Sequence, residues 1–299
     1  MDTIIETTQS ISEYYLEGEY GRMRYWSSTP QQGVPIVLIH GYGALIEHWR
    51  RVMPRIAQEH TVYALDLYGF GYSTRPRVPP TCQMWSRQVA TLLEHVQSDA
   101  AVIVGHSMGG IVATQFARDY PQLTRGLVLV NSAGLQPTQE PSAFDRAFFR
   151  LVQSNGVGEI LAGIFANSWG VRQGLSSAYH RKEMVTPELI ETFSAPLREP
   201  NSIQSYLATT RALMNLSLDI KPGDLPGPTL LLWGAKDRSI PPAVAQFFKQ
   251  QLVPHADIHV ITDSGHCPFD EAAEDFCTAL LPWVNRLMLG NTPLLAQTV

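Results

Sequence analysis

The residue best suited to do chemistry in this chain is Ser107, the middle residue of a Gly-x-Ser-x-Gly sequence at positions 105–109. An apolar run at 100–104 precedes it, and apolar residues at helical spacing follow it. A strand that turns at once into a helix gives its middle residue strained backbone angles, and small neighbours let the two elements cross. The pattern predicts a serine hydroxyl held above a sheet at a helix N-terminus, which favours developing negative charge. The alternative is an ordinary glycine-rich turn.

A serine hydroxyl becomes a good nucleophile only when a base takes its proton, and that base needs an acid that orients it. Asp237 and His266 each follow an apolar, strand-like run, at 229–233 and 258–262. Open parallel sheets build their sites at the carboxyl ends of strands. The sequence therefore predicts Ser107 as nucleophile, Asp237 as acid and His266 as base. The alternatives are a turn or helix-capping residue at 237 and a partly buried loop histidine at 266.

The oxyanion of an ester's transition state needs backbone N–H donors. We expect one from Met108, directly after the nucleophile, and one from Tyr42, in the sequence His40-Gly41-Tyr42-Gly43 after the apolar run 34–39. A glycine-rich turn without a catalytic role is the other interpretation of that tetrapeptide. Asp66 follows another strand and is interpreted as a cap of its loop rather than as a second acid.

Strand-like runs alternate with helical periodicity along most of the chain. The runs after the first pair are apolar throughout, which is typical of a parallel sheet covered on both faces by helices. The predicted strands lie at 12–27 (an antiparallel pair), 34–39, 61–65, 101–104, 127–130, 229–233 and 258–262, and the predicted helices at 47–58, 83–97, 108–118 and 271–287.

The region between 131 and 229 contains no strand-like run, and residues 141–216 have the pattern of several short helices. We therefore expect an α/β core formed by residues 1–134 and 217–299, with an inserted helical cap at 135–216. Large apolar side chains are candidates to bind substrate, although packing within the core or the cap would explain them equally well. These candidates are Trp49, Phe144, Phe148 and Phe165.

Composition limits the function classes. The 22 basic and 27 acidic residues give a net charge of −5, with no basic run, so we expect no nucleic-acid partner. The three cysteines have no metal-binding spacing, so no metal site is expected and a reducing compartment is favoured. The N-terminus lacks the features of a signal or transit peptide, and no apolar run is long enough to span a membrane. Peripheral attachment to a membrane stays open.

On these residues the chain resembles the α/β-hydrolase superfamily over about residues 12–288. The resemblance implies the α/β-hydrolase fold, with Ser107, Asp237 and His266 as the triad and with no metal or organic cofactor. Relatives that use an aspartate nucleophile, such as haloalkane dehalogenases and epoxide hydrolases, are disfavoured because position 107 is a serine.

Longer strings, at 40–43, 48–50, 63–73, 125–134 and 265–268, resemble the pheophytinase and chlorophyll dephytylase group. This likeness implies hydrolysis of the phytyl ester of chlorophyll or pheophytin, in the cytoplasm or peripherally at the thylakoid membrane. Plant pheophytinases carry Asn and Leu beside the nucleophile, where this chain has His106 and Met108, so the choice between the two pigments stays open. The rival hypotheses are a generic carboxylesterase, a carbon–carbon bond hydrolase and a non-catalytic binding protein.

Overall fold

The computed structural model describes residues 10–134, 154, 156, 160, 163, 164, 166–213 and 220–288. One eight-stranded sheet runs through this part of the chain, in the order β1-β2-β4-β3-β5-β6-β7-β8. β2 is antiparallel to β1 and β4, and every other pairing is parallel. The strands are β1 (Ser10–Gly18), β2 (Gly21–Thr29), β3 (Ile36–Ile39), β4 (Val62–Leu65), β5 (Ala101–His106), β6 (Thr124–Val130), β7 (Thr229–Gly234) and β8 (Asp257–Ile261).

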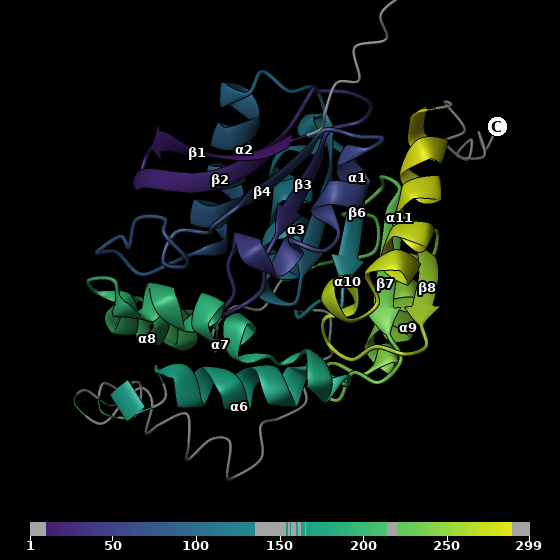
Figure 1. The fold of residues 1–299 in the computed structure, drawn as a ribbon. Coiled ribbons are helices and arrows are strands. Elements are labelled where there is room, and N and C mark those ends of the chain that lie inside the picture. Colours follow the sequence, from purple (N-terminus) through teal and green to yellow (C-terminus); the bar gives the residue numbers. More distant parts are fainter. Residues whose placement is uncertain are drawn as a thin grey trace, which may run out of the picture.

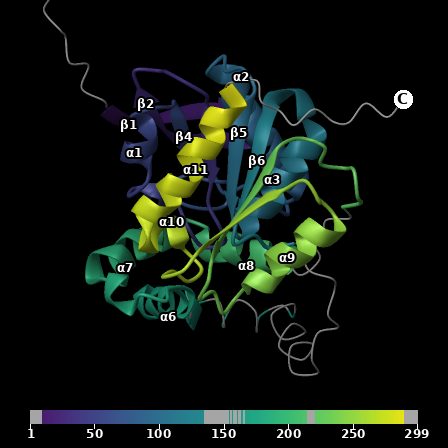
Figure 2. The same ribbon diagram turned by 90° about the vertical axis from the view of Figure 1, so that its right-hand side faces the viewer.

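Helices cover both faces of this sheet (Figures 1 and 2). One face packs against α2 (Cys82–His95), α3 (Met108–Asp119) and α9 (Pro242–Gln251). The other packs against the short helices η1 (Ile46–Trp49) and α1 (Met53–Ala57), and against α10 (Pro268–Glu271) and α11 (Ala273–Met288). Successive residues of the central strands alternate between these two cores, as the pleat requires. The predicted fold class, a mostly parallel sheet covered by helices, is confirmed.

A one-turn helix, η2 (Pro121–Leu123), lies directly before β6. Further helices make up most of the described part of the segment between β6 and β7. They lie together beyond the carboxyl ends of the parallel strands (Figure 1). They are α6 (Ser168–Ala178), η3 (Lys182–Met184), α7 (Pro187–Ser194), η4 (Ala195–Arg198) and α8 (Ser202–Leu213). The candidate substrate residues Phe144, Phe148 and Phe165 lie outside the described residues, and the division into core and cap stays a prediction.

The structure differs from the expected elements in four places. The helix expected at 47–58 is divided into η1 and α1, and the one expected at 271–287 is divided at Ala272 into α10 and α11. Helix α9 was not expected, although Pro242 at its first turn is a typical start signal. β8 is largely exposed rather than apolar throughout, because it is an edge strand with one neighbour.

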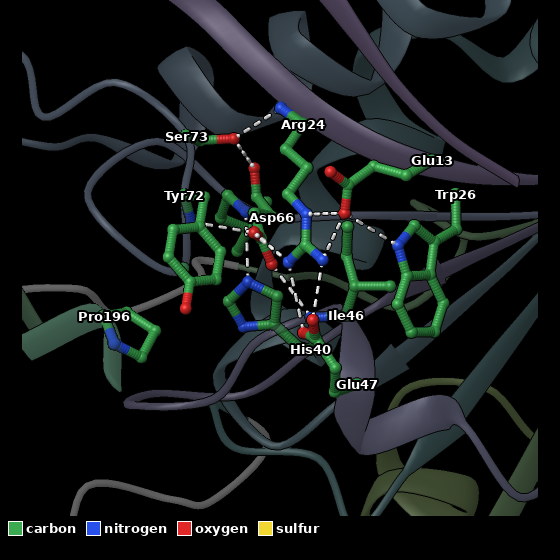
Figure 3. Close-up of polar contacts among 12 residues, drawn as sticks. Glu13, Arg24, Trp26, His40, Ile46, Glu47, Asp66, Tyr72, Ser73 and Pro196 are labelled. Carbon is green, nitrogen blue, oxygen red and sulfur yellow. Dashed lines mark hydrogen bonds and ion pairs between the residues drawn. The ribbon is translucent and has the colours of Figure 1, made fainter. Parts of the chain in front are cut away.

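Asp66, directly after β4, joins three chain segments from a fully buried position (Figure 3). Its Oδ1 accepts a hydrogen bond from the backbone N–H of Ile46 at 2.8 Å. Its Oδ2 accepts from the N–H of Tyr72 at 2.9 Å and from Nη1 of Arg24 at 3.2 Å. A buried carboxylate is tolerated only when it is paired and hydrogen-bonded. These contacts match the interpretation of Asp66 as a loop cap.

Arg24 extends this network toward the surface. Its guanidinium also forms ion pairs with Glu47 at 2.6 Å and with Glu13 at 2.5 Å (Figure 3). Burial raises the pKa of Asp66 to about 6, against the opposing effect of Arg24. The network fixes the segment that follows the glycine-rich turn after β3, and so fixes the place of that turn above the sheet.

Replacing Asp66 with asparagine should destabilise the fold by roughly 3 kcal/mol, because the amide NH₂ cannot accept hydrogen bonds, leaves a buried N–H without an acceptor and removes one of the three negative charges that face Arg24. The midpoint of urea unfolding measures this loss. The control is Glu13→Gln, at the exposed end of the network, where we expect a loss of at most about 1 kcal/mol. Equal midpoints for the two variants would contradict this account.

Candidate active site

Ser107 occupies a sharp turn between β5 and α3, with φ 52° and ψ −119°. Such angles are strained for a residue with a side chain. Two glycines make the turn sterically allowed. A Cβ on Gly105 would clash with the backbone carbonyl of Gly109, and a Cβ on Gly109 would clash with that of Ile39. The structure therefore has the strained strand-to-helix turn that the sequence predicts.

Asp237 and His266, predicted as acid and base, are hydrogen-bonded side chain to side chain. Nδ1 of His266 lies 2.7 Å from Oδ2 of Asp237. An ionised carboxylate only accepts hydrogen bonds, so Nδ1 carries the proton and Nε2 is left as the basic nitrogen. Burial is the largest single effect on the pKa of Asp237 and works to raise it, but the hydrogen bond and charge of His266, together with the hydrogen bonds from Ile240 and Asn131, hold that pKa below its ordinary value.

Ser107 and His266 both line one cavity of about 540 Å³. No hydrogen bond joins the two side chains, both of which the structure describes. Contacts between a nucleophile and its base are often long before substrate binds, so this geometry is compatible with a triad. The structure thus brings the three predicted residues to the carboxyl ends of β5, β7 and β8.

The two expected oxyanion donors lie in chain segments that meet at the nucleophile. Met108 begins α3, where the first N–H groups have no acceptor within the helix. Tyr42 lies in the turn after β3 and lines the cavity. Its neighbour Gly41 approaches so closely that an added Cβ would lie 3.1 Å from Cβ of Ser107. This placement suits an oxyanion hole, and the role of the two N–H groups stays a prediction.

The remaining wall of the cavity comes from the helices between β6 and β7, which we call the inserted helices. α6, α7, η4 and α8 contribute mainly apolar and small side chains, among them Val171, Leu175, Phe193 and Leu207. None of the described lining residues is a lysine, arginine, aspartate or glutamate. Trp49, predicted to bind substrate, is not among the lining residues. It is fully buried, with its ring centroid 4.1 Å from that of Phe269, so it packs in the core.

Three buried histidines surround this site as neutral groups. Burial lowers the pKa of His40 to about 4 and holds the pKa values of His48 and His106 well below the ordinary range. Nε2 of His106 lies 2.8 Å from the backbone carbonyl of His266 and must therefore donate a proton to it. His106 thus holds the backbone of the predicted base.

One residue close to the triad was missed from the sequence. Asn131, directly after β6, has φ +43° and donates from Nδ2 to Oδ2 of Asp237 at 2.6 Å. Its Oδ1 accepts the N–H of Gly234 at 3.1 Å. Its place at the end of a central strand was the available signal, but the side chain it meets lies more than a hundred residues away in sequence.

Comparison with known proteins identifies the family. Residues 34–273 match the model of the alpha/beta hydrolase fold. The chain belongs to this family. It is 30% identical to the pimeloyl-[acyl-carrier protein] methyl ester esterase of Vibrio vulnificus over 88% of this chain and 98% of that protein. It is 27% identical to the 2-hydroxy-6-oxo-2,4-heptadienoate hydrolase of Pseudomonas putida, over 78% of this chain and 83% of that protein.

Solved structures agree on the fold. A serine hydrolase involved in carbazole degradation is similar with a TM-score of 0.75 and 23% identity, over 92% of this chain and 99% of that chain. A thermophilic esterase from Thermogutta terrifontis is similar with a TM-score of 0.73 and 24% identity, over 92% and 99%. By its family match and its relatives, the chain is a hydrolase of the alpha/beta fold. Across the residues that the structure describes, no helix could span a membrane and no side-chain cluster could hold a metal ion.

Acid should weaken this fold because its histidines are held neutral. In the unfolded chain a histidine gains a proton as the pH falls through 6.5, whereas His40 stays neutral until about pH 4. Stability is therefore lost between these two values, by at most about 3 kcal/mol for this one group. Urea unfolding of wild type and His40→Gln between pH 7 and 4.5 measures it. We expect a smaller loss with falling pH in the variant, and identical losses would refute the assignment.

Proposed function

We propose that this protein is a serine hydrolase of carboxylic esters, with Ser107 as nucleophile, His266 as general base and acid, and Asp237 as the acid that orients it. The observation that carries the proposal is the 2.7 Å contact between His266 Nδ1 and Asp237 in a cavity that the strained Ser107 also lines. A protein that only bound ligands would have no use for the strain at Ser107 or for this set of groups.

The proposed reaction has two halves. Nε2 of His266 takes the proton of Ser107 as Oγ attacks the ester carbonyl, and the oxyanion receives hydrogen bonds from the N–H groups of Tyr42 and Met108. His266 then protonates the leaving alcohol, and an acyl-enzyme remains. A water molecule, deprotonated by His266, attacks the acyl carbonyl and releases the acid, and the proton returns to Ser107. Asp237 stabilises the imidazolium that forms in each half.

The cavity supports a neutral, largely apolar substrate. Its described walls carry apolar side chains and no lysine or arginine that would pair with a carboxylate. This favours an ester over the carbon–carbon bond hydrolase alternative, since the Pseudomonas putida relative is named for a substrate that is itself a carboxylate. The generic carboxylesterase is the second candidate, supported by the methyl ester esterase relative.

Within the ester class we propose a long isoprenoid ester, specifically the phytyl ester of chlorophyll or pheophytin. Burying half of the phytyl carbons would contribute about 8 kcal/mol at roughly 0.8 kcal/mol per CH₂, and ordering the chain would offset part of it. The inserted region 135–216 would act as a cap over this chain. Ile160 and Ile164, 65% and 52% exposed, support peripheral contact with a membrane from a cytoplasmic location.

The triad makes a direct prediction. Ser107→Ala should lower kcat on the order of 10⁶-fold, and Asp237→Asn by up to about 10⁴-fold through the wrong imidazole tautomer. Release of nitrophenol from nitrophenyl esters measures both, with Ser177→Ala on the exposed side of α6 as the matched control. Full activity of Asp237→Asn would mean that another carboxylate is the acid.

The substrate makes a second, separate prediction. Wild-type enzyme should release phytol from detergent-solubilised chlorophyll a or pheophytin a, with kcat/KM well above that for a two-carbon ester, because only the long chain gains binding energy from the apolar walls. Chromatography of the products measures this. If the enzyme hydrolysed short esters efficiently but left the pigments intact, the generic carboxylesterase would replace the dephytylase as the proposed function. If a fluorophosphonate probe did not label Ser107 in the wild-type protein, the proposal that this protein is a serine hydrolase would be wrong.

A further inference from the structure

Glu271, the last residue of α10, is a buried carboxylate outside the triad, 1% exposed. Its Oε1 accepts the backbone N–H groups of Gly265 at 2.9 Å and Cys267 at 3.2 Å, on either side of His266. Its Oε2 accepts those of His180 at 2.7 Å and Arg181 at 2.9 Å, directly after α6. One side chain thus joins the loop of the catalytic base to the inserted helices.

This arrangement satisfies the carboxylate fully. A buried carboxylate is costly unless its oxygens are hydrogen-bonded, and each oxygen here accepts two N–H groups. Hydrogen bonds to an ionised acceptor are stronger than those between neutral groups. The two segments also pack too closely for any residue but glycine at 265, because a Cβ there would lie 2.6 Å from the backbone nitrogen of His180 and 2.8 Å from the carbonyl oxygen of Ala178.

His266 itself is held from three directions. Its backbone N–H donates to the carbonyl of Ala178, the last residue of α6, at 3.0 Å. Its own carbonyl accepts from Nε2 of His106 at 2.8 Å, and its Nδ1 donates to Asp237 at 2.7 Å. The nitrogen that would take the serine proton, Nε2, has no partner among the described residues. One of the three holding bonds therefore comes from an inserted helix, and it depends on the 180–181 segment staying against the 265–267 loop.

We propose that Glu271 is a positioning residue for the catalytic base. Its carboxylate fixes the 265–267 loop to the end of α6, so His266 keeps a productive orientation only while the inserted helices are docked. The inserted helices are then part of the catalytic machinery as well as a wall of the cavity. The inference rests on the proposed function, in that it takes His266 as the base.

The preceding residue offers a matched comparison. Asp270 is also buried on α10 and also anchors the inserted region, since it accepts the Tyr179 hydroxyl at 2.5 Å and pairs with Arg50 at 3.1 Å. Unlike Glu271, it accepts no bond from the N–H groups of residues 265–267. A purely structural role would make the two carboxylates equivalent, whereas positioning of the base would set Glu271 apart.

The test compares Glu271→Gln, Asp270→Asn and the exposed Glu274→Gln, assayed on a soluble nitrophenyl ester well below each melting temperature. In Glu271→Gln the amide NH₂ would face two N–H donors and push the loop away. A misplacement of about 1 Å costs on the order of 10²-fold, so we expect kcat to fall by about that factor with KM little changed. Fluorophosphonate labelling of Ser107 should slow in parallel. Asp270→Asn should lower the melting temperature with a much smaller loss of kcat, and Glu274→Gln should match wild type.

If Glu271→Gln does not fold, Gly265→Ala separates the same two segments while keeping the carboxylate, and it should show the same loss of kcat. Equal kcat losses in Glu271→Gln and Asp270→Asn, or unchanged kcat in Glu271→Gln or Gly265→Ala, would overturn the proposal. These outcomes are distinct from failure of the proposed function, which would show as wild type that neither hydrolyses esters nor is labelled at Ser107.

Discussion

The close crossing of β5 and α3 at Ser107 is the constraint on which the rest of the site depends. A residue with a side chain at φ 52° persists only where its surroundings over-determine it. Here its N–H donates to the carbonyl of Val130, and its own carbonyl accepts the N–H groups of Gly110 and Ala133. The end of β6 and the residues that follow it therefore hold the backbone of Ser107 at both its N–H and its carbonyl.

The residue that follows β6 also positions the acid. One residue past β6, Asn131 adopts a positive φ and bonds both the carboxylate of Asp237 and the N–H of Gly234 at the end of β7. Asp237 also accepts the N–H groups of Ser239 and Ile240, which fixes its other oxygen. The nucleophile after β5 and the acid after β7 are thus both held by β6, the strand between them, and by the residues that follow it. The base is placed differently, on a longer loop after an edge strand, which explains why its backbone needs support from His106, Ala178 and Glu271.

The sequence was informative where function depends on local chain geometry. The strained turn at Ser107 needs glycines at fixed positions, and apolar runs mark the strands whose ends hold Asp237 and His266. It was uninformative where function depends on contacts between distant segments. Asn131 meets Asp237 across 106 residues, and Glu271 meets the N–H groups of His180 and Arg181 across 91 and 90. Trp49 was predicted to bind substrate but packs in the core, because residue type alone does not distinguish a core indole from one that lines a cavity.

The electrostatics of the cavity depend on the absence of charged side chains from its described walls. Its described walls contain no formal charge, and His48 and His106 are kept neutral by burial. The charge that would form on His266 during the reaction therefore has the carboxylate of Asp237 as its hydrogen-bonded counter-charge, in surroundings where water does little screening. A cationic side chain in the cavity wall would oppose that charge. Burial in apolar surroundings keeps His48 and His106 neutral, so neither adds a positive charge that would oppose the one forming on His266.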